Sequence, residues 1–422
     1  MAYVKRLIFS IPLMYAIVSP YMNGQDLIID QVRKTVVYIQ GNYSCHEPRI
    51  VNGVQATNAG GSPIFETTCS QVGTGFLIEV PLGELGSGLS APLLVTSKHL
   101  IRHQSLGSPK GVMEYFDTVN AVMNTIRPNI SGSYISSVPI QVKDHGFLIC
   151  SIDDLDPDAD VAVCMIKSSD SFYDFKTIPP DMFVTQSNIQ TMKLNETDEV
   201  LFTGLFLPYH GANRNYPIVR HGKLALIPKE KIPWSNPAGG ESMQDLYLAD
   251  ITSWGGNSGS PVFVRRSGAQ EQGGLMASVQ YLLLGVMQGY FNSDRPASLD
   301  TAAITDTAHL DIKLSDNSGI AAVVPAQKIM EILGQNRITA YISLIKGMSY
   351  SKEGKLPEAE SSFKNAIDTL RKSDPGHPLL REAFRDYANF LQSMGRFTEA
   401  NFQMRLANLV NETSKRTDNQ LR

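Results

Sequence analysis

The sequence is poor in the features that would bind a metal, a nucleic acid or a membrane. Its 422 residues include only four cysteines, with no Cys-x-x-Cys pair and no Cys/His cluster at zinc spacing, so neither a metal nor a cofactor is expected. The formal net charge of −4 leaves no basic excess for a nucleic-acid partner. No apolar run reaches the roughly 20 residues that a membrane-spanning helix needs.

The N-terminus has the pattern of an export signal. The basic pair Lys5 and Arg6 precedes an apolar stretch over residues 7–18, and polar residues follow. Because this stretch is too short to span a bilayer, we interpret residues 1–24 as a signal peptide. Its removal would leave no stable membrane anchor, and the protein would be secreted or periplasmic. An uncleaved anchor or a buried strand is the alternative interpretation.

The four cysteines agree with export, because disulfides persist in oxidising compartments. One candidate hairpin is flanked by Cys45 and Cys69, and another by Cys150 and Cys164. This nearest-neighbour pairing suits facing antiparallel strands. Four cysteines allow three pairings, however, and the sequence alone does not choose among them.

Glycine and proline concentrate before residue 320, where short apolar runs alternate with turn residues. This pattern predicts a mainly β region that forms a barrel or sandwich. The predicted strands are residues 35–40, 75–80, 93–96, 147–150, 161–166, 199–204, 261–264 and 282–289. A short helix or extended arm is expected over residues 25–34, and an amphipathic helix over residues 325–333 with proline in its first turn.

From about residue 337 the apolar period changes to about 3.6, and an internal repeat begins. The spacing of small and aromatic residues resembles a tetratricopeptide repeat, with Gly354 in the first copy and Gly395 in a second, weaker copy. The diagnostic residues of the first copy are Gly347, Tyr350, Gly354, Ala359, Phe363 and Ala366. The resemblance implies a helical repeat domain over residues 337–416 that binds a protein partner, followed by a tail over residues 417–422. A plain pair of helical hairpins is the alternative.

A candidate nucleophile lies in the segment Gly255-Gly256-Asn257-Ser258-Gly259. Acyl transfer needs a serine hydroxyl on a tight turn beside backbone N–H donors. The glycine at position 256 lets its peptide plane rotate, so that the amides of Gly256 and Ser258 can face a developing oxyanion. A strand follows at once and would anchor the turn. A Gly/Ser-rich surface loop is the alternative.

Two further segments supply a candidate base and a carboxylate. His99 follows an apolar strand, and imidazole titrates near neutral pH without perturbation. Asp160 comes directly before another apolar strand, where a buried carboxylate could orient the histidine. His103 is the rival base. The neighbouring acids read as a solvated turn: Asp153, Asp154, Asp156 and Asp158.

These segments resemble the signatures of chymotrypsin-like (trypsin-like) serine peptidases, and His99, Asp160 and Ser258 follow that family's chain order. The first predicted strand and the Asn-Ser-Gly core also resemble the bacterial Deg-related members. Lys98 beside the histidine departs from the family pattern. The resemblance implies a double six-stranded β-barrel over residues 25–336 and hydrolysis of protein or peptide substrates through a Ser-His-Asp triad.

The same resemblance nominates an oxyanion hole at Gly256 and Ser258. It also nominates Thr252, Gln288 and Tyr290 as the lining of the substrate pocket. No acid is among these three, so a small or uncharged substrate side chain is expected. Residues 49–53 look like a zymogen cleavage site but are interpreted as a loop. A catalytically inactive protease-like scaffold or adaptor, and an esterase that uses the same triad, are the alternatives.

Overall fold

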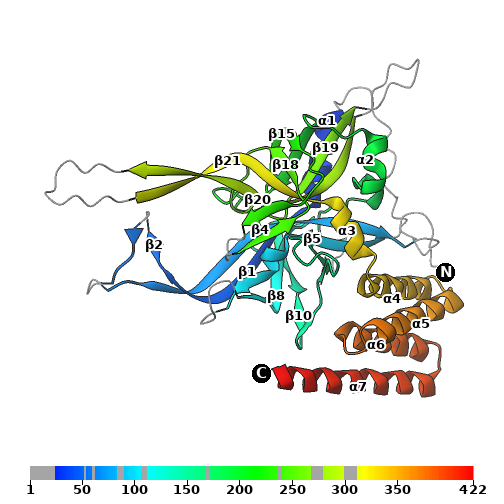
Figure 1. The fold of residues 1–422 in the computed structure, drawn as a ribbon. Helices are drawn as coiled ribbons and strands as arrows, with labels where there is room; N and C mark the ends of the chain where they lie inside the picture. Colours follow the sequence, from blue (N-terminus) through cyan, green and yellow to red (C-terminus); the bar gives the residue numbers. More distant parts are fainter. Residues whose placement is uncertain are drawn as a thin grey trace, which may run out of the picture.

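The computed structural model of the chain describes residues 24–51, 54–58, 62–82, 90–105, 112–166, 171–235, 240–267, 279–298 and 311–421. The predicted signal peptide lies outside these residues except for Gly24. Figure 1 shows two β units stacked on each other, with a group of helices at the C-terminal end. The predicted mainly β fold with C-terminal helices is confirmed.

The first β unit is an antiparallel sheet of seven strands. Their order is β12 (Ser151–Ile152), β13 (Ala162–Met165), β5 (Ser90–Thr96), β4 (Phe65–Pro81), β1 (Val36–Pro48), β8 (Thr118–Asn124) and β9 (Ile135–Gln141). Within the described ranges its edge strands β12 and β9 do not pair, so the sheet differs from the closed six-stranded barrel that was expected. Two hydrogen bonds connect the ends of these strands instead. Val142 follows β9, and its carbonyl accepts the amides of Ile149 and Cys150, just before β12, at 2.7 and 3.3 Å.

The second β unit is a closed antiparallel barrel of six strands, as expected. Their order is β14 (Glu199–Gly204), β15 (Ile218–Leu226), β18 (Tyr247–Asp250), β21 (Asp311–Pro325), β20 (Val279–Ser298) and β19 (Pro261–Ser267). Every predicted strand overlaps a strand of the structure. Four small hairpins are added: β2 (Ile50–Val51) with β3 (Val54–Gln55), β6 (Arg102–Gln104) with β7 (Met113–Tyr115), β10 (Lys143–Asp144) with β11 (Phe147–Leu148), and β16 (Ile232–Ser235) with β17 (Glu241–Gln244).

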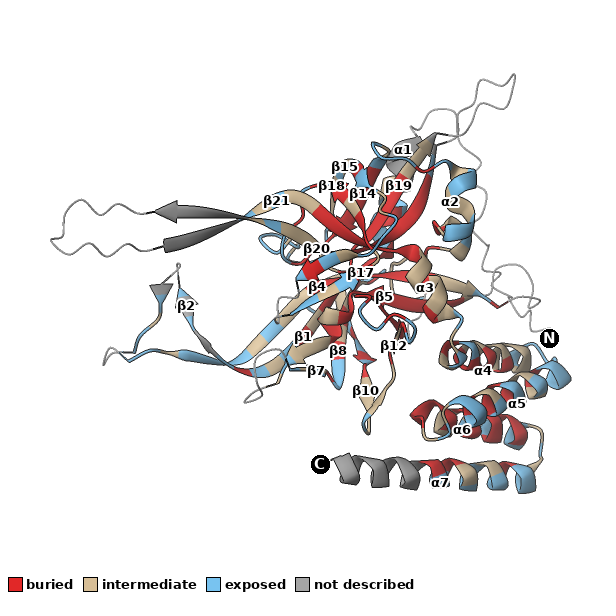
Figure 2. Ribbon diagram, in the orientation of Figure 1, coloured by how far each residue is buried: buried red, intermediate tan, exposed pale blue. Residues whose placement is uncertain are grey.

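The core explains how the two units are held together. Successive side chains of a strand point to opposite faces, and both faces are buried in β5 and over residues 73–78 of β4 (Figure 2). Leu77 and Leu94 pack inside the first sheet. Phe76 and Val95 belong to an apolar cluster that also contains residues of the barrel and Ile329 of a C-terminal helix. One continuous hydrophobic contact therefore joins the sheet, the barrel and the helices.

Helices lie mainly at the ends of the described chain. They are α1 (Gly24–Thr35), α2 (Gln186–Met192), α3 (Ala326–Leu333), α4 (Asn336–Lys352), α5 (Leu356–Ser373), α6 (Pro378–Ser393) and α7 (Phe397–Leu421). α3 packs on β13 and β20, while α4 packs on α5 and α6 on α7. Gly354 and Gly395 end α4 and α6 with φ values of 76° and 75°, a left-handed conformation that favours glycine. The repeat character of these hairpins stays a prediction. No helix in the described ranges is long and apolar enough to cross a bilayer.

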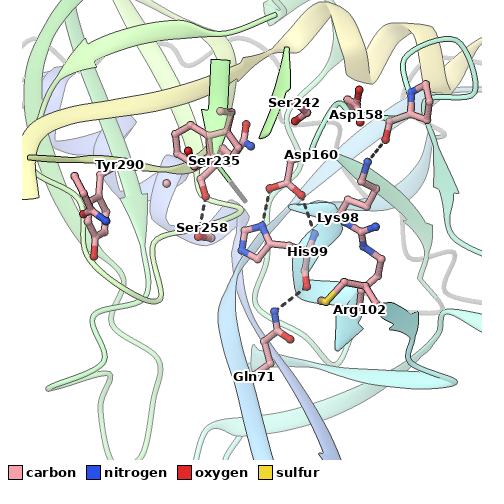
Figure 3. Close-up of a pocket in the computed structure, with 16 residues that line it drawn as sticks. Gln71, Lys98, His99, Arg102, Asp158, Asp160, Ser235, Ser242, Ser258 and Tyr290 are labelled. Carbon is pink, nitrogen blue, oxygen red and sulfur yellow. Dashed lines mark hydrogen bonds and ion pairs between the residues drawn. The ribbon is translucent and has the colours of Figure 1, made fainter. Parts of the chain in front are cut away.

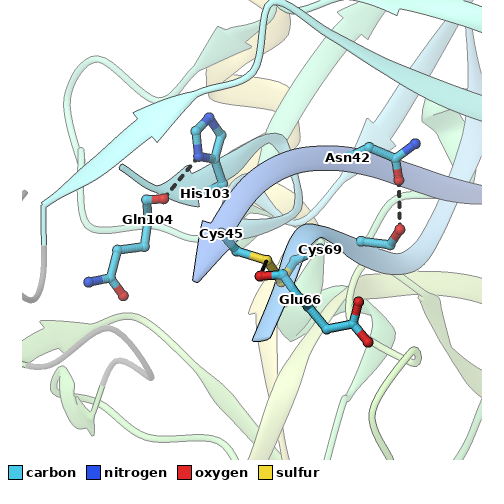
Figure 4. Close-up of a disulfide and its surroundings, with 7 residues drawn as sticks. Asn42, Cys45, Glu66, Cys69, His103 and Gln104 are labelled. Atoms are coloured by element: carbon cyan, nitrogen blue, oxygen red, sulfur yellow. Dashed lines mark hydrogen bonds between the residues drawn. A yellow bond between two sulfur atoms is a disulfide. The ribbon is translucent and has the colours of Figure 1, made fainter. Parts of the chain in front are cut away.

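The two disulfides join Cys45 to Cys69 and Cys150 to Cys164, which is the nearest-neighbour pairing. The first links β1 to β4 in a ribbon that projects from the body, as does the outer part of β20 and β21 (Figures 1 and 4). The amide of Arg49 donates to the carbonyl of Ile64 at 2.9 Å in the same ribbon. Of the segment that resembles a zymogen cleavage site, residues 49–51 therefore belong to this projection, and residues 52 and 53 lie outside the described residues. The second disulfide closes a loop around Asp160.

Candidate active site

Neighbouring strands bring His99 and Asp160 together. His99 lies in a short 3₁₀ helix, Lys98–Ile101, directly after β5, and Asp160 directly precedes β13. β5 and β13 are paired, with Thr96 opposite Ala162. His99 follows Thr96 and Asp160 precedes Ala162, so the two residues lie close together beyond the end of this pair. One carboxylate oxygen of Asp160 lies 2.6 Å from Nδ1 of His99, and the other accepts the backbone amide of His99 at 2.8 Å (Figure 3). Asp160 thus holds both the ring and the backbone of the histidine.

Asp160 remains an anion although only 5% of its surface is exposed. Burial alone raises the pKa of a carboxyl group, because it disfavours the charged form. Here the charge of His99, its two hydrogen bonds and the nearby ammonium of Lys98 outweigh burial, and the pKa of Asp160 lies below its usual value. A buried carboxylate that stays charged can stabilise an imidazolium.

The nucleophile turn lies between β18 and β19 of the barrel. Gly256 and Gly259 adopt φ values of 93° and 83° on the two sides of Ser258. A Cβ at Gly259 would lie 1.9 Å from the carbonyl oxygen of Thr74, so this position accepts only glycine without a rearrangement. Within the part of the chain that the structure describes, the amides of Gly256 and Ser258 donate no hydrogen bond. Two N–H groups beside the hydroxyl are therefore free to bind an oxyanion.

Thr74 of β4 fastens this turn to the first sheet. Its hydroxyl donates to the carbonyl of Gly256 at 2.8 Å and accepts the amide of Leu205 at 2.9 Å, while its own amide donates to the carbonyl of Ser258 at 2.8 Å. Asn257 is buried and donates from Nδ2 to the carbonyl of Leu205 at 2.6 Å. The Oδ1 of Asn257 accepts the amide of Trp254 at 2.8 Å, so Asn257 is held within the barrel side of the turn. The interpretation of residues 49–53 as a loop is wrong in part, because Ile50 and Val51 form strand β2.

Ser258 and His99 line the same cavity, which has a volume of about 650 Å³. The hydroxyl of Ser258 donates to the backbone carbonyl of Gln288 at 3.0 Å. Among the described residues it makes no hydrogen bond with His99. The histidine is therefore oriented by Asp160, whereas the serine is turned toward β20.

Two of the three nominated pocket residues lie in this cavity. Gln288 and Tyr290 line it on β20. Thr252 does not line it, because the extended segment buries Ile251 and Ser253 on either side and leaves Thr252 exposed. No local pattern points to the β16–β17 hairpin, yet its Trp234, Ser235 and Ser242 also line this wall.

The acidic loop before Asp160 differs from the solvated turn that was expected. Asp153 and Asp156 are buried, and the ammonium of Lys328 on α3 lies 3.6 and 2.9 Å from their carboxylates. The same ammonium lies 3.4 Å from Asp245 and 3.3 Å from Glu331. Lys328 is distant in the sequence, so the local pattern could not reveal this partner. Asp154 and Asp158 are exposed, as expected.

The rival base His103 has a different environment. It stacks on Tyr43 and packs against Phe116, with ring centroids 5.2 and 4.7 Å apart, and its Nδ1 lies 3.1 Å from a backbone carbonyl. No carboxylate pairs with it in the described ranges. We find no group of three or more His, Cys, Asp or Glu side chains among the described residues that could hold a metal ion.

The wall beside His99 also contains residues that were not nominated from the sequence, among them Gln71, Lys98 and Arg102. The amide of Gln71 donates to the carbonyl of His99 at 2.7 Å and so supports the backbone of His99. Lys98 is buried and donates to the carbonyl of Pro157. Arg102 lies beyond His99 on β6. Of these three residues, only Lys98 stood out in the sequence, because the peptidases that this segment resembles often have a small residue before the histidine.

Comparisons with known proteins give a distant similarity of fold. No family model and no curated protein matches the chain. Among solved structures, the chain is similar to the active form of the Rv3671c protease from M. tuberculosis, with 14% identity, a TM-score of 0.32, and coverage of 79% of this chain and 93% of that chain. The inactive form of the same protease gives 14% identity, a TM-score of 0.32, and coverage of 76% and 98%. At this identity the similarity concerns the fold alone.

Proposed function

We propose that this protein is a secreted serine endopeptidase in which His99, Asp160 and Ser258 form the catalytic triad. The observation that carries the proposal is the contact between Asp160 and His99, at 2.6 Å, on the wall of the cavity that also contains Ser258. A buried, charged carboxylate fixes the tautomer of the imidazole and stabilises its protonated form. This arrangement is what a serine needs to become a nucleophile at neutral pH.

The proposed reaction begins when Ser258 leaves the carbonyl of Gln288 and hydrogen bonds to Nε2 of His99. The imidazole takes the hydroxyl proton as the oxygen attacks the substrate carbonyl. The amides of Gly256 and Ser258 receive the negative charge that develops on the carbonyl oxygen. His99 then gives the proton to the departing amine. In the second half of the reaction His99 takes a proton from water, the water oxygen attacks the acyl group, and His99 returns the proton to the oxygen of Ser258 as the acid product leaves.

The other parts of the proposal follow the expected domain layout. Residues 1–24 direct export, residues 25–336 form the protease domain, and the helices of residues 337–416 recruit a protein partner. The two disulfides support a location in an oxidising compartment. Gln288 and Tyr290 support a pocket for an uncharged substrate side chain, because neither carries a charge at neutral pH.

One observation favours a second candidate function, a protease-like scaffold without turnover. The hydroxyl of Ser258 is engaged by Gln288 and not by His99. A fluorophosphonate probe separates the two functions, because it labels only an activated serine. The endopeptidase predicts labelling of Ser258 that His99→Ala abolishes, and the scaffold predicts no labelling of the folded protein. Digestion of casein then separates the endopeptidase from an esterase, which would cleave ester substrates alone.

A further inference from the structure

Arg102 is a cation without a carboxylate partner in the wall of the candidate active-site cavity. In the described part of the chain its guanidinium forms no ion pair, and its Nε is buried without an acceptor. Its neighbour is the ring of Tyr115, whose centroid lies 5.7 Å from the guanidinium carbon. Residues 106–111, which link β6 to β7, contain no Asp or Glu.

The other charges of the cavity wall act mainly on His99 and Lys98. Asp160 is bound to His99. The charges of Asp160 and Asp158 both act on Lys98: burial lowers the pKa of this lysine, the two carboxylates oppose that shift, and Arg102 reinforces it. Asp158 is exposed in the same wall, but it forms no ion pair with Arg102 among the described residues, and Arg102 repels the neighbouring ammonium. An anionic group of a ligand would remove this imbalance.

The position of the Arg102 side chain is set by its strand partner. Arg102 lies opposite Tyr115 in the β6–β7 pair. An aromatic face attracts a cation but does not neutralise it. Burial raises the pKa of Tyr115, so the phenol stays uncharged and cannot serve as a counter-ion. The guanidinium is thus held in place while its charge and its N–H donors remain for a ligand.

The direction of the proposed reaction tells which part of a substrate would meet Arg102. The acyl part becomes bonded to Ser258, which lies beside β20, and the imidazole hands its proton to the leaving amine. Figure 3 shows Tyr290 on one side of Ser258 and His99, and Arg102 on the other. The chain that leaves with the amine therefore extends past His99 toward Arg102.

We propose that Arg102 is a specificity residue that binds a carboxylate in the part of the substrate that follows the cleaved bond. This inference rests on the proposed endopeptidase function. The carboxylate can come from an Asp or Glu side chain, or from the C-terminus of a peptide that ends shortly after the cleaved bond. Arg102 suits either source, because a guanidinium fork matches the two oxygens of a carboxylate.

The test uses the full-length protein with Ser258→Ala, so that binding is measured without turnover. Fluorescent peptides that differ only in Glu or Gln at the first three positions after the expected cleavage site are compared by anisotropy. We expect the Glu peptides to bind about tenfold more tightly, the order of one charge-assisted hydrogen-bonded contact. Peptides with a free or an amidated C-terminus at the same positions distinguish the second source of the carboxylate.

Three further variants assign the effect to Arg102. Arg102→Gln should bring the ratio of Glu to Gln binding close to one, and Arg102→Lys should keep part of it because the charge remains. Arg385→Gln removes one positive charge from the exposed surface of α6 and should keep the full ratio. Equal binding of Glu and Gln peptides, with free and amidated termini also equal, overturns the inference. So does a preference that survives Arg102→Gln.

The outcome is separable from that of the proposed function. In one case the unaltered protein fails to react with a fluorophosphonate, while its binding still shows a Glu preference that depends on Arg102. This result contradicts the endopeptidase function but supports the carboxylate subsite. In the opposite case Ser258 is labelled, but Glu and Gln peptides bind equally, and so do peptides with free and amidated termini. This result supports the endopeptidase function and contradicts the subsite.

Discussion

Thr74 and Gly256 are joined by a 2.8 Å hydrogen bond from the threonine hydroxyl to the glycine carbonyl. The bond crosses from β4 of the first sheet to the turn that carries Ser258, and the two residues are 182 positions apart in the sequence. It fixes the peptide that follows Gly256. The turn that carries the candidate oxyanion hole is therefore anchored by the contact between the two β units.

Replacing this hydroxyl should impair the reaction more than substrate binding. Thr74→Val keeps the shape of the side chain but leaves the Gly256 carbonyl and the Leu205 amide without their partner, at a cost of about 1–3 kcal/mol for each buried group. We expect kcat to fall at least tenfold with a smaller change in KM, because the two amides lose their fixed direction. Thr74→Ser, which keeps the hydroxyl, is the control. Equal kinetics of the valine and serine variants would contradict this role.

The second disulfide should support the candidate site, and the first should not. Cys150 and Cys164 close a loop of 14 residues that contains Asp160. Replacing both by alanine should lower the free energy of unfolding by about 3 kcal/mol and slow the fluorophosphonate labelling of Ser258. The matched variant without Cys45 and Cys69 should lose stability but keep the labelling rate, since that bond lies in the projecting ribbon. Parallel losses of labelling in both variants would argue against a local role.

Lys328 should be a large contributor to stability. Its side chain is 12% exposed and lies within 3.6 Å of carboxylates on the loop that leads to Asp160. Lys328→Met leaves buried Asp153 without its cation and leaves Asp156 with Lys231 alone, and we expect a loss of about 3 kcal/mol in urea unfolding. The control is Lys364→Met. The side chain of this lysine is 57% exposed, and Glu360 keeps its ion pair with Arg396 in the variant, so the loss should be less than about 1 kcal/mol. Losses of the same size in the two variants would contradict the account.

The effect of Lys328→Met should depend on pH in a defined direction. Burial raises the pKa of Asp156, but hydrogen bonds and charges from Lys328 and Lys231 bring it below the usual value. A lowered carboxyl pKa adds stability above the unfolded value of about 3.9, and this stability is lost as the pH falls through the folded value. The pKa of Lys328 is raised, because its carboxylate partners outweigh burial, so its contribution persists up to alkaline pH. The stability gap between the two proteins should be steady near neutral pH and narrow below about pH 4; a gap that widens in acid would be contrary to this expectation.

The sequence predicted the parts of the site that local patterns encode. Ser258, His99 and Asp160 each adjoin a strand and occur in a recognisable short segment, so their positions at strand ends could be expected. The first sheet was harder to predict from the sequence, because no strand was predicted over β8 and β9. The contact of Val142 with Ile149 and Cys150 across the sheet edges also involves no strand pairing.

Residues that act through distant partners could not be predicted in this way. Thr74 and Lys328 are ordinary in their own segments, and their roles come from contacts with the nucleophile turn and the acidic loop. Trp234 enters the cavity wall only because a small hairpin folds over β20, where a Cβ at Gly289 would touch its ring at 3.2 Å. Thr252 was nominated by its spacing from Ser258. Spacing does not tell which side of the chain is buried, and in the structure Ile251 and Ser253 are buried whereas Thr252 is exposed.

The most direct measurement is the rate of peptide cleavage by the full-length protein with Asp160→Asn. An amide at this position keeps the shape but favours the wrong tautomer of His99 and cannot stabilise the imidazolium. The account predicts that kcat at neutral pH falls by about 10⁴ while the protein stays folded. Cleavage within tenfold of the unaltered protein, or cleavage that survives Ser258→Ala, would show that this pair of residues does not drive the reaction.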